Sequence, residues 1–133
     1  MPLVVDASVA LAWVIPDERT AATDGLLMTA RSDGIVVPTM WTYEVANALT
    51  LSLRRGRLGR DSLDDAFAVL GALPTVAIPD PGVERLARLA VQTGLTAYDA
   101  GYIWVAEREA LPLATFDGRI RDAASARGIT VLL

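Results

Sequence analysis

Short apolar runs alternate with amphipathic segments along the whole chain. Each run is bounded by Gly, Pro or a polar residue, which is typical of a short buried strand. These runs lie at residues 3–5, 35–37, 75–78, 111–115 and 129–133. Between them, apolar residues recur every three or four positions, which predicts helices over residues 8–14, 20–31, 40–55, 61–72, 81–94, 97–109 and 118–127.

Strands that alternate with helices favour a parallel sheet covered by helices on both faces. The fold class is therefore α/β, and 133 residues suit a single domain over residues 1–133. In open sheets of this kind, ligands bind beyond the carboxyl ends of the strands, where the strand order reverses. A strand order of 3-2-1-4-5 would place that point between the first and fourth strands.

Four acidic residues fall at this predicted edge of the sheet. Asp6 follows the first strand in VVDASVALAW, and Asp117 follows the fourth strand in LATFDGR. Glu44 in TYEVANAL and Asp99 in TAYDAGYIW lie in the first turns of helices that begin after strand ends. The predicted topology therefore allows all four carboxylates to converge on one place.

Each of these acids can also be explained as part of a helix start. Asp6 and Asp117 suit N-caps, and Thr96 and Asp99 have the spacing of a capping box. Glu44 near a helix N-terminus is favoured by the helix dipole and would then be solvated surface. However, several of these acids interrupt apolar or small-residue surroundings, where an unpaired carboxylate costs several kcal/mol. Taken together, they favour one shared site.

The composition restricts the chemistry of such a site. The chain has no histidine and no cysteine, and all of its basic residues are arginine. Ser-His-Asp triads, thiol nucleophiles, Schiff-base lysines and the usual zinc ligands are therefore excluded. Carboxylates held close together repel each other unless a cation lies between them or one is protonated. One or two Mg²⁺ or Mn²⁺ ions, which prefer oxygen ligands, would remove that repulsion and support nuclease chemistry.

The series VVDASVALAW, YEVANAL, LTAYDAGYIWVAE and LATFD resembles the PIN-domain family, in particular the ribonuclease toxins of VapBC-type toxin–antitoxin pairs. The resemblance spans almost the whole chain and rests on four acidic motifs in the family's order and spacing. It implies a PIN-like three-layer α/β/α sandwich with a five-stranded parallel sheet. It also implies a Mg²⁺- or Mn²⁺-dependent endoribonuclease that acts on RNA, is usually a homodimer and is inhibited by a cognate antitoxin.

The same resemblance assigns roles to individual residues. The catalytic and metal-binding acids of the family correspond to Asp6, Glu44, Asp99 and Asp117. Supporting polar groups correspond to Ser8, Asn47 and Thr115. Related toxins often carry a lysine near the position of Ala12, so substrate contacts are expected to differ here.

One dense basic segment is a candidate RNA contact. It comprises Arg54, Arg55, Arg57 and Arg60, at the end of the helix that carries Glu44. These arginines either bind RNA phosphates or simply favour a helix C-terminus beside a solvated loop. The net charge of −4 argues against a broadly basic nucleic-acid binder but not against one local stripe. Trp13, Trp41 and Trp104 suit base stacking or an antitoxin contact, although core packing is the commoner role.

Two other classes of function stay open on the sequence alone. One is a catalytically silent PIN-like scaffold that binds protein or RNA, against which the intact acids argue. The other is a phosphatase with an aspartyl-phosphate at Asp6, but that chemistry usually needs a lysine and a second aspartate where Ser8 stands. Because no apolar run could cross a bilayer and no signal peptide is recognisable, a cytoplasmic protein without membrane contact is expected.

Overall fold

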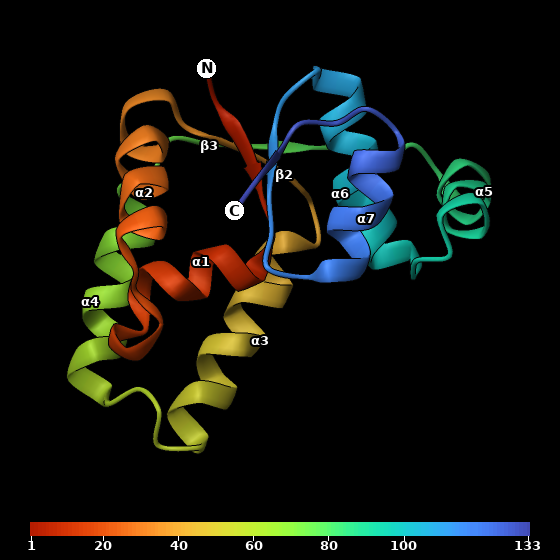
Figure 1. Cartoon of the computed structure of the whole chain (residues 1–133). Coiled ribbons are helices and arrows are strands. Elements are labelled where there is room, and N and C mark those ends of the chain that lie inside the picture. The colour runs from red at the N-terminus through yellow and green to blue at the C-terminus, as the bar shows by residue number, and fades with distance from the viewer.

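The five predicted strands form one parallel sheet in the order β3-β2-β1-β4-β5 (Figure 1). The computed structural model describes all 133 residues. The strands are β1 (Leu3–Val5), β2 (Ile35–Pro38), β3 (Thr75–Ile78), β4 (Leu113–Ala114) and β5 (Val131–Leu132). The helices are α1 (Ala7–Val14), α2 (Ala21–Asp33), α3 (Trp41–Arg54), α4 (Arg60–Gly71), α5 (Val83–Thr93), α6 (Ala97–Glu109) and α7 (Gly118–Ala126), with a 3-10 turn η1 (Pro16–Glu18) after α1.

The helices cover the two faces of the sheet as two separate layers. Helix α1 packs against α2, α3 and α4 on one face, and α6 packs across β1, β2 and β4 on the other face. Helices α5 and α7 both pack against α6, and α5 lies on its outer side, at the right of the molecule in Figure 1. Right-handed crossovers between parallel strands produce this division, because the strand order reverses direction after β3. The predicted three-layer α/β/α sandwich is thereby confirmed.

Strand β1 lies at the centre of the core. Its Val4 is paired with Val36 of β2 on one side and with Leu113 of β4 on the other. All residues of β1, β2 and β4 are buried, as expected for strands that helices cover on both faces. The carboxyl end of β1, which carries Asp6, is therefore fixed by packing on every side. None of the helices combines the length and apolar character that a membrane-spanning helix needs.

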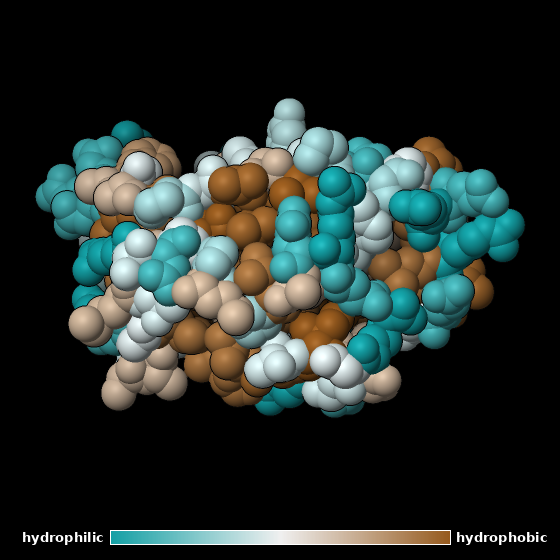
Figure 2. Space-filling view, turned by 90° about the horizontal axis from the view of Figure 1, so that it is seen from above, coloured by the Kyte–Doolittle hydropathy of each residue, from teal (hydrophilic) through white to brown (hydrophobic).

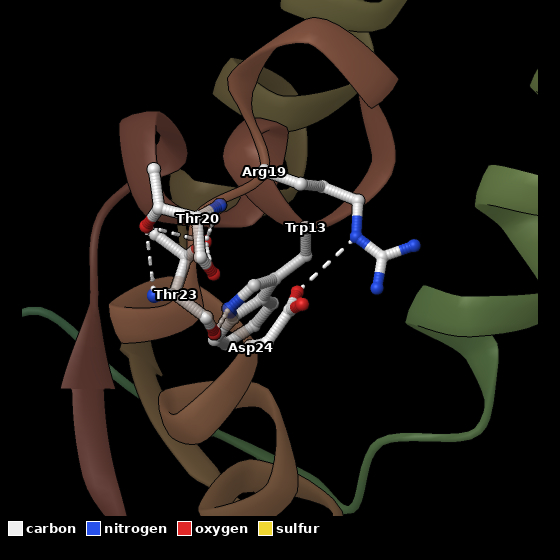
Figure 3. A network of polar contacts seen from close by, with 5 residues as sticks. All are labelled: Trp13, Arg19, Thr20, Thr23 and Asp24. Carbon is white, nitrogen blue, oxygen red and sulfur yellow. Dashed lines mark hydrogen bonds and ion pairs between the residues drawn. The ribbon is translucent and has the colours of Figure 1, made fainter.

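The indole of Trp13 belongs to this core and joins two helices. It is 2% exposed, and its N–H donates to the backbone carbonyl of Thr23 at 2.9 Å. Thr20 and Thr23 form a capping box at the start of α2, and Arg19 pairs with Asp24 at 3.1 Å beside it (Figure 3). The network holds the start of α2 against α1, so Trp13 is a structural residue.

Three local features differ from the predicted elements. Strands β4 and β5 are shorter than expected, because the N–H groups of Leu111 and Ile129 bond back to the ends of α6 and α7. The turn η1, which opens with Pro16, was not expected. Strand β3 lies at the edge of the sheet and leaves Val76 56% exposed, although an apolar run suggested a buried strand.

The edge of the sheet where the strands begin carries an open depression of about 610 Å³. Apolar side chains such as Leu111 and Ile129 line it, and Glu107 and Arg127 form an ion pair at 2.9 Å there. Figure 2 looks onto this edge and shows apolar residues gathered in the middle, with hydrophilic residues at both ends. The predicted acidic residues lie at the opposite edge, where the strands end.

Candidate active site

Asp6 is the most buried of the four acids and is held by three hydrogen bonds. It is 5% exposed, at the junction of β1 and α1. One carboxylate oxygen accepts from the Ser8 hydroxyl at 2.6 Å and from the Val9 N–H at 3.2 Å, and the other accepts from the Thr115 hydroxyl. Asp6 therefore is an N-cap of α1 and also faces β4, so the two interpretations of this residue are compatible.

The same hydroxyl groups connect Asp6 to the loop that carries Asp117. The Thr115 hydroxyl accepts from the Asp117 N–H at 3.0 Å, and the Ser8 hydroxyl accepts from the Phe116 N–H at 3.1 Å. The Asp117 carboxylate is exposed and caps α7 by accepting from two backbone N–H groups. Ser8 and Thr115, predicted as supporting polar groups, thus fix two of the acids relative to each other.

Glu44 lies in the first turn of α3 and is bound by a residue of α6. The buried hydroxyl of Tyr102 donates to the Glu44 carboxylate at 3.2 Å. Burial and the negative charge of Glu44 raise the pKa of Tyr102 above its ordinary value of 10, so the phenol keeps its proton and remains a donor. Glu44 is consequently neither solvated surface nor a freely rotating side chain.

Asp99 lies in the first turn of α6, next to one arginine. Thr96 caps α6 through its hydroxyl, which accepts from the Asp99 N–H at 3.1 Å. The guanidinium of Arg119 donates to the carbonyl of Gly94 at 3.0 Å, and its charge acts on Asp99. Because α1, α3 and α7 begin close together in Figure 1 and α6 packs across the same strands, the acids come from four elements that meet at one edge.

The acids at this edge of the sheet influence one another's pKa values. Burial is the main cause that raises the pKa of Asp6, Glu44 and Asp99 above their ordinary values. Neighbouring carboxylates raise these pKa values further: Asp117 acts on Asp6 and Asp99, and Asp6 and Asp99 act on Glu44. The hydrogen bonds from Ser8, Thr115 and Tyr102 oppose the rise. Ionising the whole cluster is therefore unfavourable without a cation.

The donor groups suit a hard divalent cation, but they do not form a closed cage. No three acidic side chains are close enough to enclose a metal ion by themselves. Mg²⁺ usually binds through one or two carboxylates and keeps several water or phosphate oxygens as its other ligands. A cluster of oxygen donors with no histidine or cysteine fits that mode of binding, with room left for a phosphate and a water.

Other predicted residues lie farther from the acids. Asn47 is exposed one turn beyond Glu44, and its side chain makes no hydrogen bond to the cluster. The four arginines Arg54, Arg55, Arg57 and Arg60 are exposed, with Arg54 roughly 15 Å along the helix axis from Glu44. Trp41 is buried, and Trp104 is half-buried with Arg108 stacked 5.3 Å from its ring centroid.

Two arginines near the acids were not predicted from the sequence. Arg119 lies beside Asp99, and the guanidinium of Arg121 donates to the carbonyl of Thr115 at 3.2 Å. Arg119 follows Asp117 by two positions and Arg121 follows it by four, so both lie at the start of the helix that this acid caps. Their spacing after a candidate acid was the available signal.

Comparison with known proteins gives a consistent result. The family described as "PIN domain" matches residues 3–126. Ribonuclease VapC3 of Pyrobaculum aerophilum is 32% identical over 126 residues, which cover 92% of this chain and 94% of the relative. VapC ribonuclease Mb0985 of Mycobacterium bovis is 30% identical over 126 residues, 94% of this chain and 93% of the relative. A second Pyrobaculum aerophilum protein, named Exonuclease VapC9, is 38% identical over 76 residues, 56% of each chain.

Two solved structures share the fold. PAE2754 from Pyrobaculum aerophilum superposes with a TM-score of 0.72 at 28% identity, covering 99% of this chain and 84% of that one. FitAcB from Neisseria gonorrhoeae gives a TM-score of 0.62 at 15% identity, covering 98% and 96%. The second likeness concerns the fold alone.

Proposed function

This chain belongs to the PIN-domain family and to its VapC branch, and we propose that it is a metal-dependent endoribonuclease, the toxin of a toxin–antitoxin pair. The observation that carries this proposal is the meeting of Asp6, Glu44, Asp99 and Asp117 at the edge of the sheet where the strands end. The pKa values of Asp6, Glu44 and Asp99 are raised by burial and by neighbouring carboxylates, as expected for a site that favours a bound cation.

The residues of this chain have distinct roles in the proposed reaction. Asp6 is the fixed point, because Ser8, Val9 and Thr115 bind its carboxylate and leave it little freedom. Glu44 is oriented by Tyr102, whereas Asp117 is exposed at the rim and available to substrate. Arg119 adds one positive charge beside Asp99, where an RNA phosphate would approach.

Mg²⁺ or Mn²⁺ bound by one or two carboxylates of the cluster Asp6, Glu44, Asp99 and Asp117 would supply an activated water and neutralise the charge that develops on the phosphate. The protein itself contributes by holding the carboxylates in place. The carboxylates stand in positions fixed before substrate arrives, so little reorganisation is needed at the moment of reaction. No histidine base is required in this arrangement, in agreement with the composition.

The partners follow from the same family membership. We infer that a cognate antitoxin protein inhibits the enzyme and that the chain acts as a homodimer. The relatives named VapC support the first inference, since the name belongs to toxin–antitoxin pairs. Arg54, Arg55, Arg57 and Arg60 are proposed to bind RNA phosphates away from the point of cleavage.

The decisive experiment uses a circular RNA, which has no ends for an exonuclease to attack. Purified protein with Mg²⁺ or Mn²⁺ should linearise the circle and leave 5′-phosphate and 3′-hydroxyl termini, whereas excess chelator should stop the reaction. Asp99→Asn should abolish cleavage, and Asp64→Asn, an exposed acid on α4, should retain it. Degradation of linear RNA with an intact circle would indicate an exonuclease, and equal cleavage in chelator would exclude a metal role.

A further inference from the structure

A cavity of about 310 Å³ opens beside the acidic edge of the sheet. It is bounded by the carboxyl ends of β2 and β3 and by the N-terminal parts of α3, α5 and α6. Its walls are mainly apolar, with Met40, Ile78, Leu86 and Trp104 among the lining side chains. The volume is at the lower end of the roughly 300 to 1,000 Å³ that small-ligand sites occupy. It therefore suits a ligand of about the size of one nucleobase.

Two residues that line the cavity are close in sequence to acids of the candidate active site. Met40 precedes Glu44 by one turn of helix, and the Glu44 N–H donates to the Met40 carbonyl at 3.0 Å. On the other wall, Tyr98 comes directly before Asp99 in the first turn of α6. A strand of RNA whose phosphate lies at the acids thus has the cavity next to it.

The chemistry of the walls favours a base over a phosphate. No arginine lines the cavity, and its one ionisable acid, Asp80, would repel a phosphate group. Tyr98 offers an aromatic ring at the mouth and is 68% exposed, although nothing in the fold requires it to be. Aromatic rings on which unstacked bases pack are the common way in which proteins hold single-stranded RNA.

Asp80 provides a group that can discriminate between bases. One of its oxygens accepts from the Gly82 N–H at 2.9 Å, which fixes the side chain and leaves the other oxygen without a donor from the protein. A carboxylate only accepts hydrogen bonds, so it favours a base that offers an amino group. Adenine, cytosine and guanine carry such a group, whereas uracil has no amino group and offers only its ring N3–H.

We propose that this cavity is a base-recognition site, in which Tyr98 stacks on an unpaired RNA base next to the cleaved phosphodiester and Asp80 selects a base with an amino group. The proposal rests on the ribonuclease function proposed above and adds to it the feature of the substrate that decides where the RNA is cut.

The test is cleavage of an RNA pool with a randomised internal segment, followed by sequencing of the new ends. The wild-type protein should disfavour uracil at one position beside the cut. Tyr98→Ala should weaken the preference at that position on the order of tenfold, as expected for the loss of one stacked base. Asp80→Asn, which keeps the shape of the side chain, should restore uracil at the same position.

Tyr43→Ala is the matched control. Tyr43 is also an exposed tyrosine directly before an acid of the cluster, but it does not line the cavity. This variant should keep the wild-type preference. If the wild-type protein cuts RNA and both cavity variants retain its preference, the inference is wrong and the ribonuclease function stands. If Tyr98→Ala instead only dissociates a dimer in sedimentation, the cavity belongs to an interface between copies. Absence of any RNA cleavage by the wild type would overturn the function and the inference together.

Discussion

Tyr102 donates its phenolic hydrogen to the Glu44 carboxylate at 3.2 Å, although the two residues lie 58 positions apart in the chain. Tyr102, a residue of α6, is completely buried, whereas Glu44 extends from the start of α3. The bond joins the two helix layers across the end of the sheet. It gives a partly buried carboxylate a fixed direction and lowers its pKa against the effect of burial.

Tyr102→Phe removes only this hydroxyl and tests its role as a positioning group. We expect cleavage to fall about tenfold, the scale of one hydrogen bond to a charged group. The hydrogen bond from Tyr102 lowers the pKa of Glu44, so its removal should raise that pKa. The acidic limb of the pH–rate profile should therefore move to higher pH. A purely structural role would reduce stability and leave the profile in place. Tyr43→Phe is the neutral comparison.

Replacement of Asp6 separates its two roles. Asp6→Asn retains an oxygen that can accept from the Val9 N–H, so the cap of α1 should survive and the metal-free fold should be at least as stable as wild type. Asp6→Ala loses the cap and should cost about 1 kcal/mol more than the asparagine variant. Both should abolish cleavage. Urea unfolding in chelator, alongside an RNA assay, measures the two effects, and an active Asp6→Asn protein would remove this residue from the mechanism.

The pKa of Asp99 leads to a prediction about stability and pH. Burial, followed by the charge of Asp117, raises its folded-state pKa above the ordinary value of 3.8. The folded state therefore binds the proton more tightly, so ionisation destabilises it as the pH rises from 3.8 through the folded value. Asp99→Asn should match wild type below that window and exceed it at neutral pH by up to about 1 kcal/mol, after allowance for solvent screening. Urea midpoints measured in chelator across this range provide the check.

Divalent cations should reverse that penalty. A ligand at about one hundred times its Kd stabilises the folded state by about 2.7 kcal/mol, which raises Tm by several degrees in a domain of this size. Mn²⁺ should have this effect on wild type, a much smaller one on Asp6→Asn and Asp99→Asn, and the full effect on Asp64→Asn. An equal rise in all four proteins would place the cation elsewhere.

The four arginines between the end of α3 and the start of α4 predict a particular dependence on salt. If two of them bind phosphates of single-stranded RNA, changing both to glutamine should lower the slope of log affinity against log salt by about 1.4. Binding is best measured by fluorescence anisotropy with Asp99→Asn, which should not cut the probe. Arg85→Gln on α5 should leave the slope unchanged. An unchanged slope in the double variant would mean that Arg54 and Arg55 only stabilise a helix end.

The sequence allowed the fold to be predicted because short buried strands and amphipathic helices each leave a distinct pattern. The strand order 3-2-1-4-5 was assumed, in keeping with the resemblance to a known fold, and with that order the rules of parallel sheets place the acids at one edge. The shortened β4 was not predictable from hydrophobicity, because Leu111 is apolar and yet its N–H completes the end of α6. The exposure of β3 depends on its place at the edge of the sheet, and an apolar run does not report that.

Within the candidate site, residue type and position identified the acids, but not their partners. The pairing of Tyr102 with Glu44 arises from the packing of α6 across the sheet, which no local pattern encodes. The influence of Arg119 on Asp99 likewise depends on how α7 approaches α6. The sequence also presented the caps and the site as alternatives, whereas Asp6 and Asp117 each cap a helix and also lie in the acidic cluster.

The hydrogen bond between Thr115 and Asp6 joins residues that lie 109 positions apart. Asp6 therefore leaves the ribosome long before Thr115 does. A growing polypeptide that has folded β1 to β3 still lacks the strand that must insert beside β1 and bring Asp117 with it. The proposed nuclease thus remains unassembled while most of its own message is being translated. The proposed ribonuclease activity would therefore arise only when synthesis of the chain is almost complete.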